Sequence, residues 1–184
     1  MKGNRVYLIT GERAAGKTTR LRNLAFLFRD HGISVGGFFS EGYWENNIRT
    51  HYRFRPVWGE ELQVLCSRDK HPEWIQTGTY FFNPEAVQSG KRILESEAGG
   101  VDLLVIDEVG MLETRKQIWY ESLQYLLNET DQCMLWSVRK DFSDRIIEFF
   151  EIKNPVLLDV KELNTKEMYN RIVKDIAPNK CYTS

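Results

Sequence analysis

Residues 11–19, GERAAGKTT, have the types and the spacing of a loop that binds phosphate groups. Gly11 is followed, after four residues, by Gly16, Lys17 and Thr18, which matches the pattern G-x-x-x-x-G-K-[ST]. In such a loop, successive backbone N–H groups point into one concave surface, and the following helix adds the positive end of its dipole. The lysine would lie between the β- and γ-phosphates of a nucleotide, and the threonine hydroxyl is an oxygen ligand suited to Mg²⁺.

Every residue of this loop is therefore a candidate for contact with a nucleotide: Gly11, Glu12, Arg13, Ala14, Ala15, Gly16, Lys17, Thr18 and Thr19. Lys17 is also a candidate catalytic residue, and Thr18 is a candidate metal ligand. Glu12 and Arg13 are unusually bulky for such a loop. We interpret Arg13 as exposed to solvent, in preference to a contact with a phosphate or a neighbouring subunit.

Two adjacent carboxylates, Asp107 and Glu108, end the apolar run VDLLVIDE. A near-continuous apolar run of this length is typical of a parallel strand that is covered on both faces. Because the carboxyl ends of parallel strands share one edge of the sheet, Asp107 is expected to meet the phosphate loop there and to hold Mg²⁺, directly or through water. Glu108 is a candidate to orient or deprotonate an attacking water molecule. Without the loop, a helix cap or a solvated turn would explain this acidic pair equally well.

A third group follows the strand-like run CMLWSV at residues 133–138, where Arg139 and Lys140 stand together. The guanidinium of Arg139 could stabilise charge on a phosphoryl group during its transfer, so Arg139 is a candidate catalytic residue. A solvated surface pair is an equally good interpretation. Glu108, directly after Asp107, indicates a class of sheet in which one further strand lies between the strand before the phosphate loop and the strand that ends at Asp107. We therefore predict that residues 133–138 lie between residues 5–10 and 101–107.

For the phosphate loop, the acidic pair and Arg139 to meet at one sheet edge, the chain must form an α/β fold with a mostly parallel sheet flanked by helices. Hydrophobic periodicity and Gly, Pro and Asn positions predict the elements. Strands are expected at 6–10, 33–40, 50–57, 61–66, 101–107, 133–138 and 155–160, and helices at 17–31, 83–98, 115–129, 141–150 and 165–176. The alternating run at 50–57 predicts an antiparallel extension around residues 33–66, within an insert that reaches residue 80, and residues 67–79 are expected to be loop-like.

Composition limits the class of protein. With 184 residues, 42% of them hydrophobic, the chain is expected to form a single domain over residues 1–184. The net charge of −1 gives no electrostatic argument for a nucleic-acid partner.

No apolar run approaches the roughly 20 residues of a membrane helix. The apolar stretch before the phosphate loop is too short for a signal peptide, and three widely spaced cysteines indicate reduced thiols, so a cytoplasmic location is expected. Residues 177–184 are expected to be frayed.

Several segments together resemble the family of THEP1-like nucleoside-triphosphatases. The resemblance covers most of the chain and is most specific at GERAAGKTTRL and at LLVIDEVGMLE. It implies a RecA-like P-loop fold and Mg²⁺-dependent hydrolysis of nucleoside triphosphates, ATP or GTP, with loose base preference. By motif position it assigns functional roles to Gly16, Lys17, Thr18, Asp107 and Glu108, and it places Glu41 and Glu113 at acidic positions of the family motifs.

The chain departs from the family pattern at Met111, where lysine is frequent, and at Arg13-Ala14, where Pro-Gly is more usual. Two further functions remain open. A nucleotide or small-molecule kinase would use the same phosphate loop, with an acceptor pocket built from residues 40–80. A nucleotide-dependent binding module would use the triphosphate to order a loop that a partner recognises.

Overall fold

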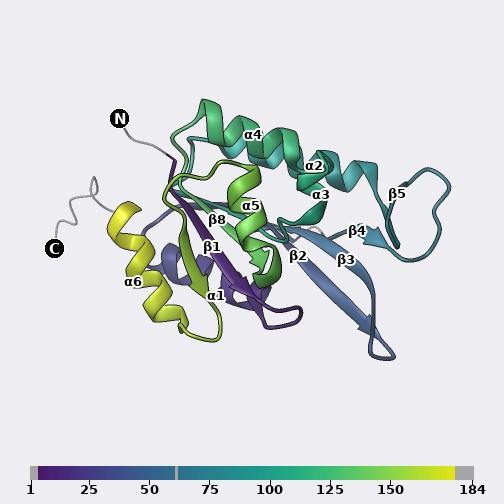
Figure 1. The fold of residues 1–184 in the computed structure, drawn as a ribbon, viewed down its shortest axis with the longest axis horizontal. Helices are drawn as coiled ribbons and strands as arrows, with labels where there is room; N and C mark the ends of the chain where they lie inside the picture. The colour runs from purple at the N-terminus through teal and green to yellow at the C-terminus, as the bar shows by residue number, and fades with distance from the viewer. Residues whose placement is uncertain (1–3, 61, 177–184) are drawn as a thin grey trace.

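A computed structural model describes residues 4–60 and 62–176 of the chain. A nine-stranded sheet forms its centre, in the order β5-β6-β4-β3-β2-β7-β8-β1-β9 (Figure 1). The strands are β1 (Val6–Gly11), β2 (Val35–Glu45), β3 (Ile48–Pro56), β4 (Gln63–Ser67), β5 (Ile75–Thr77), β6 (Tyr80–Phe82), β7 (Leu103–Ile106), β8 (Met134–Arg139) and β9 (Val156–Asp159). The helices are α1 (Lys17–Asp30), α2 (Pro84–Glu97), α3 (Met111–Thr114), α4 (Tyr120–Glu129), the 3₁₀ turn η1 (Lys140–Phe142), α5 (Ser143–Phe149) and α6 (Thr165–Ile176).

The parallel half of the sheet carries the site. Strand β8 pairs with β1 on one side and with β7 on the other, both in parallel. The predicted position of residues 133–138, between the strand of the phosphate loop and the strand of the carboxylates, is therefore confirmed. Strands β1, β7 and β8 end at one edge of the sheet, so the residues that follow them meet there.

The antiparallel half is larger than the sequence predicted. Strands β2, β3, β4, β6 and β5 pair antiparallel in turn. The expected loop at residues 67–79 was wrong in part, because it contains β5 and leads directly into β6. These strands have only three residues each, too short for an alternating pattern to identify them.

Strand β2 belongs to both halves. Its first residues, Val35 to Phe38, pair in parallel with β7, and its remainder continues past the edge of the parallel sheet and pairs with β3. A two-residue turn, Asn46-Asn47, joins β2 to β3, with φ angles of 49° and 62°. Both positions of this kind of hairpin turn require positive φ, which asparagine tolerates better than most residues. The hairpin therefore extends beyond the edge at which the site-bearing strands end (Figure 1).

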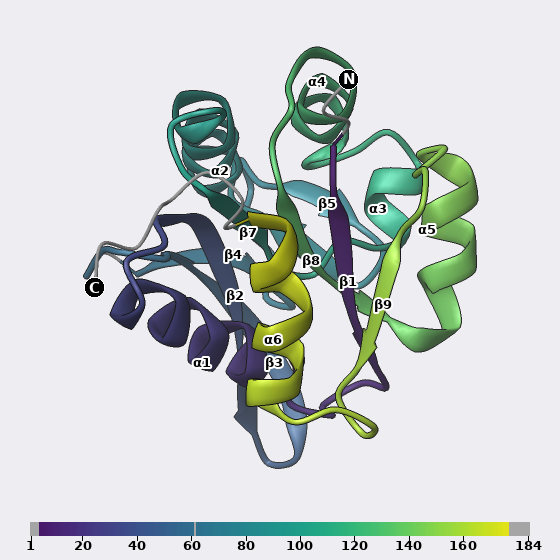
Figure 2. The same cartoon turned by 90° about the vertical axis from the view of Figure 1, so that its left-hand side faces the viewer.

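Helices cover both faces of the sheet (Figure 2). On β1, Val6 and Leu8 face the layer of α2, α4 and α5, whereas Tyr7 and Ile9 face the layer of α1 and α6. Both sets are fully buried or nearly so. This two-sided burial explains why the parallel strands appear in the sequence as continuous apolar runs.

Helix boundaries follow the sequence except at one place. Asn83 caps α2 by accepting a hydrogen bond from the backbone N–H of Glu85 at 3.0 Å. The helix expected over residues 115–129 is confirmed only for residues 120–129, which form α4; residues 115–119 are a break between the short α3 and α4. Lys116 and Ile118 in the break have φ of 59° and 53°. The break places Trp119 in the core, with its ring 4.7 Å from that of Phe38, so tertiary packing overrides local helical preference.

Within residues 4–60 and 62–176, no helix is both long enough and apolar enough to cross a membrane. Cys66 is a buried free thiol, in keeping with the expectation of reduced cysteines. Cys181 and the rest of residues 177–184, which were expected to be frayed, lie outside the described residues.

Candidate active site

The phosphate loop joins β1 to α1 at the carboxyl edge of the parallel sheet. Gly16 precedes the helix with φ of 86°, a left-handed conformation that favours glycine. Ala14 has φ of 61° and adopts the same strained region with a Cβ. The departure at Arg13-Ala14 thus places an alanine at a loop position whose backbone favours glycine.

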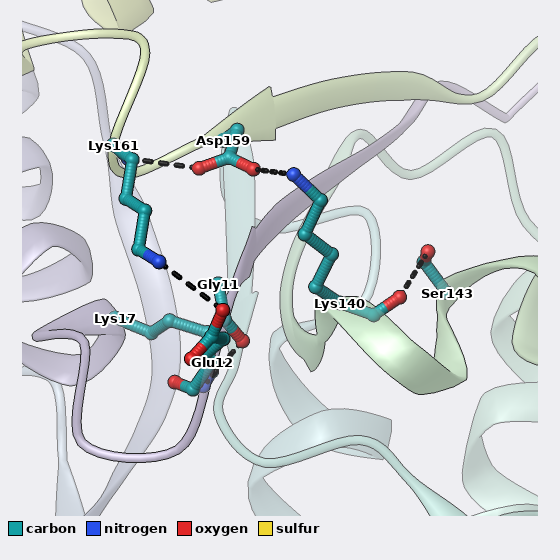
Figure 3. A network of polar contacts seen from close by, with 7 residues as sticks. All are labelled: Gly11, Glu12, Lys17, Lys140, Ser143, Asp159 and Lys161. Atoms are coloured by element: carbon teal, nitrogen blue, oxygen red, sulfur yellow. Dashed lines mark hydrogen bonds and ion pairs between the residues drawn. The ribbon is translucent and has the colours of Figure 1, made fainter.

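Lys17 is buried at the first position of α1. Its Nζ donates to the carbonyl oxygens of Gly11 at 3.2 Å and Glu12 at 2.9 Å (Figure 3). Burial lowers the pKa of Lys17, and the nearby carboxylates of Glu108 and Asp107 oppose that shift. The ammonium is thus held at the loop, close to the acidic pair that the sequence placed 90 residues away.

Asp107 is fully buried immediately after β7. Its carboxylate accepts hydrogen bonds from the backbone N–H of Ser40 at 3.0 Å and from the hydroxyl of Ser137. The Thr18 side chain also hydrogen bonds to this carboxylate. Burial raises the pKa of Asp107, as does the neighbouring charge of Glu108, while these hydrogen bonds oppose the shift. The structure therefore brings the two predicted metal ligands, Thr18 and Asp107, into contact.

Glu108 follows in a left-handed conformation with φ of 64°. Its backbone N–H donates to the Ser137 hydroxyl at 2.9 Å. A non-glycine residue in this region costs about 1–2 kcal/mol, a strain that is frequent at functional sites. The turn directs Glu108 into a cavity of about 300 Å³ that also borders the phosphate loop. The cavity is lined by Ala14, Ala15, Gly16, Lys17, Thr18, Thr19, Arg22, Glu41, Gly42, Tyr43, Trp44, Arg49 and Glu108.

The oxygen ligands at this edge suit a magnesium ion bound together with a nucleotide. Thr18 supplies a hydroxyl and Asp107 supplies a carboxylate, both hard oxygen donors. Among the described residues, no group of three or more His, Cys, Asp or Glu side chains could hold a metal ion unaided. Mg²⁺ in phosphate-transfer sites takes most of its ligands from phosphates and water, so two protein oxygens fit this role.

Glu12 does not line the cavity, and its side chain links the loop to the segment after β9. Its carboxylate pairs with Lys161 at 3.1 Å, and Lys161 in turn donates its backbone N–H to Asp159 at 2.8 Å (Figure 3). Asp159 also pairs with Lys140 at 2.7 Å. Gly11, Glu12 and the exposed Arg13 do not belong to the cavity lining, although all three were predicted to contact a nucleotide.

Arg139 lies at the expected edge, but its guanidinium is already paired. It makes two contacts with the Asp141 carboxylate, at 3.0 and 2.5 Å, and lies over the ring of Phe142. Arg139 borders a second cavity, of about 220 Å³, that does not include the phosphate loop. Glu108 lines both cavities.

Several polar residues near the site were not predicted from the sequence. Ser40 and Ser137 contact Asp107, yet a serine within a strand carries no local signal, and only the strand order brings these residues to the carboxylate. Glu41, noted only by family resemblance, pairs with Arg55 at 3.0 Å and with Arg22 at 3.5 Å. Glu113, also noted by resemblance, is buried and accepts a hydrogen bond from the Gly110 N–H at 2.7 Å, which fixes the loop after Glu108.

A strand, a glycine loop and a helix, with a buried aspartate two strands away on the same sheet edge, define the P-loop class of nucleotide-binding α/β proteins. A family model described as NTPase matches residues 6–173, so the chain belongs to the NTPase family of nucleoside-triphosphatases.

Relatives and solved structures agree with this assignment. The chain is 27% identical to the nucleoside-triphosphatase THEP1 of Thermotoga sp. strain RQ2 over 94% of its length and 96% of the relative. It is 28% identical to the nucleoside-triphosphatase THEP1 of Sulfurisphaera tokodaii over the same shares. The fold matches a human cancer-related nucleoside triphosphatase, with a TM-score of 0.72 at 19% identity over 97% of this chain and all of the other. It also matches THEP1 of Aquifex aeolicus, with a TM-score of 0.70 at 19% identity over 94% of this chain and 99% of the other. The RecA-like P-loop fold that the sequence predicted is confirmed.

Proposed function

We propose that this chain hydrolyses nucleoside triphosphates to nucleoside diphosphates and inorganic phosphate with the aid of Mg²⁺. One observation carries the proposal: Lys17, Thr18 and Glu108 line a single cavity, with Asp107 buried behind it in contact with Thr18. A triphosphate with its terminal group in this cavity would meet a cation, two oxygen ligands for a metal ion and a carboxylate.

Each residue then has a distinct role. Lys17 binds oxygens of the β- and γ-phosphates, and the backbone N–H groups of the loop bind the remaining phosphate oxygens. Thr18 and Asp107 would hold Mg²⁺, which neutralises phosphate charge when bound. Glu108, which lines the cavity together with the loop residues, orients the attacking water and accepts its proton.

Other features of the proposal come from the sequence and its resemblance. We propose that ATP and GTP are both substrates, since the relatives are named nucleoside-triphosphatases without reference to one base. A single domain over residues 1–184, a cytoplasmic location and the absence of a nucleic-acid partner remain predictions from composition.

A phosphate-release assay with ATP, GTP, CTP and UTP, with and without Mg²⁺, tests the function. Wild-type protein should release phosphate only with Mg²⁺, and Lys17→Ala should lower the rate by on the order of 100-fold or more. Lys91→Ala is the matched control, because Lys91 pairs with Glu121 in the helical layer and does not line the cavity. Tight nucleotide binding without phosphate release from any triphosphate would reject hydrolysis in favour of a binding module.

A kinase is the second candidate, and the 220 Å³ cavity favours it. That cavity is largely apolar, with Leu65, Phe82 and Trp119 among its walls, and it is lined by Glu108 but by no residue of the phosphate loop. A bound hydroxyl compound could replace water as the group that Glu108 deprotonates. Phosphate release at full rate without any acceptor would argue against this candidate, whereas a large rate increase with one acceptor and formation of its phosphate ester would support it.

A further inference from the structure

The second wall of the phosphate cavity is the β2–β3 hairpin. Gly42, Tyr43 and Trp44 of β2 and Arg49 of β3 face the loop residues across the cavity. This arrangement follows from the length of β2, which runs past the edge at which β1 and β7 end (Figure 1). A segment of the same chain is thereby placed beside the position that a terminal phosphate would occupy.

The guanidinium of Arg49 is held in a fixed position on this hairpin. Its Nη1 donates to the Tyr52 hydroxyl at 2.7 Å, and its Cζ lies 4.7 Å from the centre of the Trp44 ring and 4.9 Å from that of Tyr52. Gly42 provides the space for this side chain, because a Cβ there would lie 2.7 Å from the Arg49 Nε. Two aromatic rings and one hydrogen bond thus restrict the side chain before any ligand binds.

The charge of Arg49 is not neutralised by a protein carboxylate within residues 4–60 and 62–176, where no ion pair includes it. Its Nε is buried without a hydrogen-bond partner in the same part of the chain. The other arginines near the site differ: Arg22 and Arg55 pair with Glu41, and Arg139 pairs with Asp141. Of the two arginines that line the cavity, Arg22 and Arg49, only Arg49 has no carboxylate partner among the described residues.

Arg49 lines the same cavity as Lys17 and Glu108. Its guanidinium therefore shares with them the space that the phosphate loop borders.

We propose that Arg49 is a catalytic residue that the chain supplies to its own site, contacting an oxygen of the γ-phosphoryl group and stabilising its charge during transfer to water. The inference rests on the proposed hydrolysis. In that step the water oxygen forms a bond to the γ-phosphorus, the bond from that phosphorus to the β,γ-bridging oxygen breaks, and the water proton passes to Glu108. A nucleoside diphosphate, which leaves with the bridging oxygen, and inorganic phosphate are the products. Charge on the transferring group is what an arginine stabilises most effectively in such reactions.

The test compares Arg49→Ala and Arg49→Lys with wild type in steady-state phosphate release and in the equilibrium binding of a fluorescent ATP analogue. We expect kcat to fall on the order of 100-fold or more in both variants, while the nucleotide Kd changes by only a few-fold. Lysine should not restore the rate, because the planar guanidinium can donate two hydrogen bonds to phosphate oxygens at once, whereas the ammonium is a compact point charge. Arg53→Ala is the matched control: Arg53 belongs to the same strand and lies over Tyr43, outside the cavity lining.

A second measurement does not depend on turnover. ADP with aluminium fluoride mimics the transferring phosphoryl group, and its tight complex should form with wild type and with Arg53→Ala but not with Arg49→Ala, although ADP alone binds to all three. Gly42→Ala should lower kcat in the same direction by displacing the Arg49 side chain, and it provides an independent variant if Arg49→Ala does not fold. Wild-type kcat and normal fluoride-complex formation in Arg49→Ala would overturn the inference. Failure of wild type to hydrolyse any triphosphate would instead reject the proposed function.

Discussion

The Ser137 hydroxyl on β8 donates a hydrogen bond to the Asp107 carboxylate at the end of β7. The same oxygen accepts the backbone N–H of Glu108 at 2.9 Å. One side chain thus fixes both the proposed metal ligand and the turn that directs the proposed base. The pairing of β7 with β8, with Ile106 opposite Trp136, sets this arrangement.

Ser137→Ala should weaken the response to Mg²⁺. Without the hydroxyl, the Asp107 carboxylate loses a hydrogen bond that favours its charged form, so a metal ligand becomes harder to ionise and less well oriented. The Mg²⁺ concentration for half-maximal activity should rise about 10-fold or more. This midpoint is measured by following phosphate release as Mg²⁺ is titrated. Ser96→Ala, on the exposed side of α2, is the control and should leave the midpoint unchanged. An unchanged midpoint would show that Ser137 has no part in the metal response.

Glu108→Gln should separate binding from chemistry. The amide keeps the size of the side chain but cannot accept the water proton, so kcat should fall about 10²–10⁴-fold while nucleotide affinity remains near that of wild type. Single-turnover phosphate release and equilibrium nucleotide binding distinguish the two effects. Glu148→Gln, at an exposed position of α5, should leave both unchanged. Wild-type turnover in Glu108→Gln would remove this residue from its role.

Ala14→Gly should stabilise the protein. Ala14 has φ of 61°, where a Cβ costs about 1–2 kcal/mol, and glycine removes that strain while adding some entropy to the unfolded chain. We expect the free energy of unfolding to increase by about 0.5–1 kcal/mol in denaturant titrations. Ala15→Gly is the control next along the loop: Ala15 has no positive φ, so the same substitution there should destabilise the fold. Equal destabilisation by both would contradict strain at Ala14.

Glu113 should make stability depend on pH. Burial raises the pKa of Glu113 to about 7, and backbone hydrogen bonds from Gly110, Glu113 and Trp119 oppose only part of that shift. The folded state then holds this proton more tightly than the unfolded state. The stabilising contribution is complete below the unfolded pKa of about 4.3 and is lost as the pH rises through about 7.

The measurement is the free energy of unfolding between pH 4 and pH 8 for wild type and for Glu113→Gln. Relative to the variant, wild type should lose up to about 3 kcal/mol as the pH rises across this interval. Comparing the slopes cancels the pH dependence that other groups contribute to both proteins. Parallel curves would mean that Glu113 titrates normally.

Prediction from the sequence was most accurate where the pattern is local. The glycine loop, the strand before it and the helix after it depend on residues that are close in the chain, and their order matches the structure. The strand at 133–138 was placed correctly between β1 and β7. The sequence feature behind that prediction was Glu108 next to Asp107, which indicates a sheet with a strand between the phosphate-loop strand and the carboxylate strand. The helix over 115–129 was wrong only in its first residues, 115–119, where the break that buries Trp119 against Phe38 replaces it.

The sequence by itself therefore determined the chemistry available to this protein: a lysine and a threonine after a glycine loop, and two carboxylates after a buried strand. The tertiary structure alone decided which groups share a cavity with them. It brought Ser40, Ser137 and Arg49 to the site and left Arg139 paired with Asp141. The physical reason is that strand order and register, together with the length of β2, set these contacts between residues tens of positions apart, and no local spacing records them.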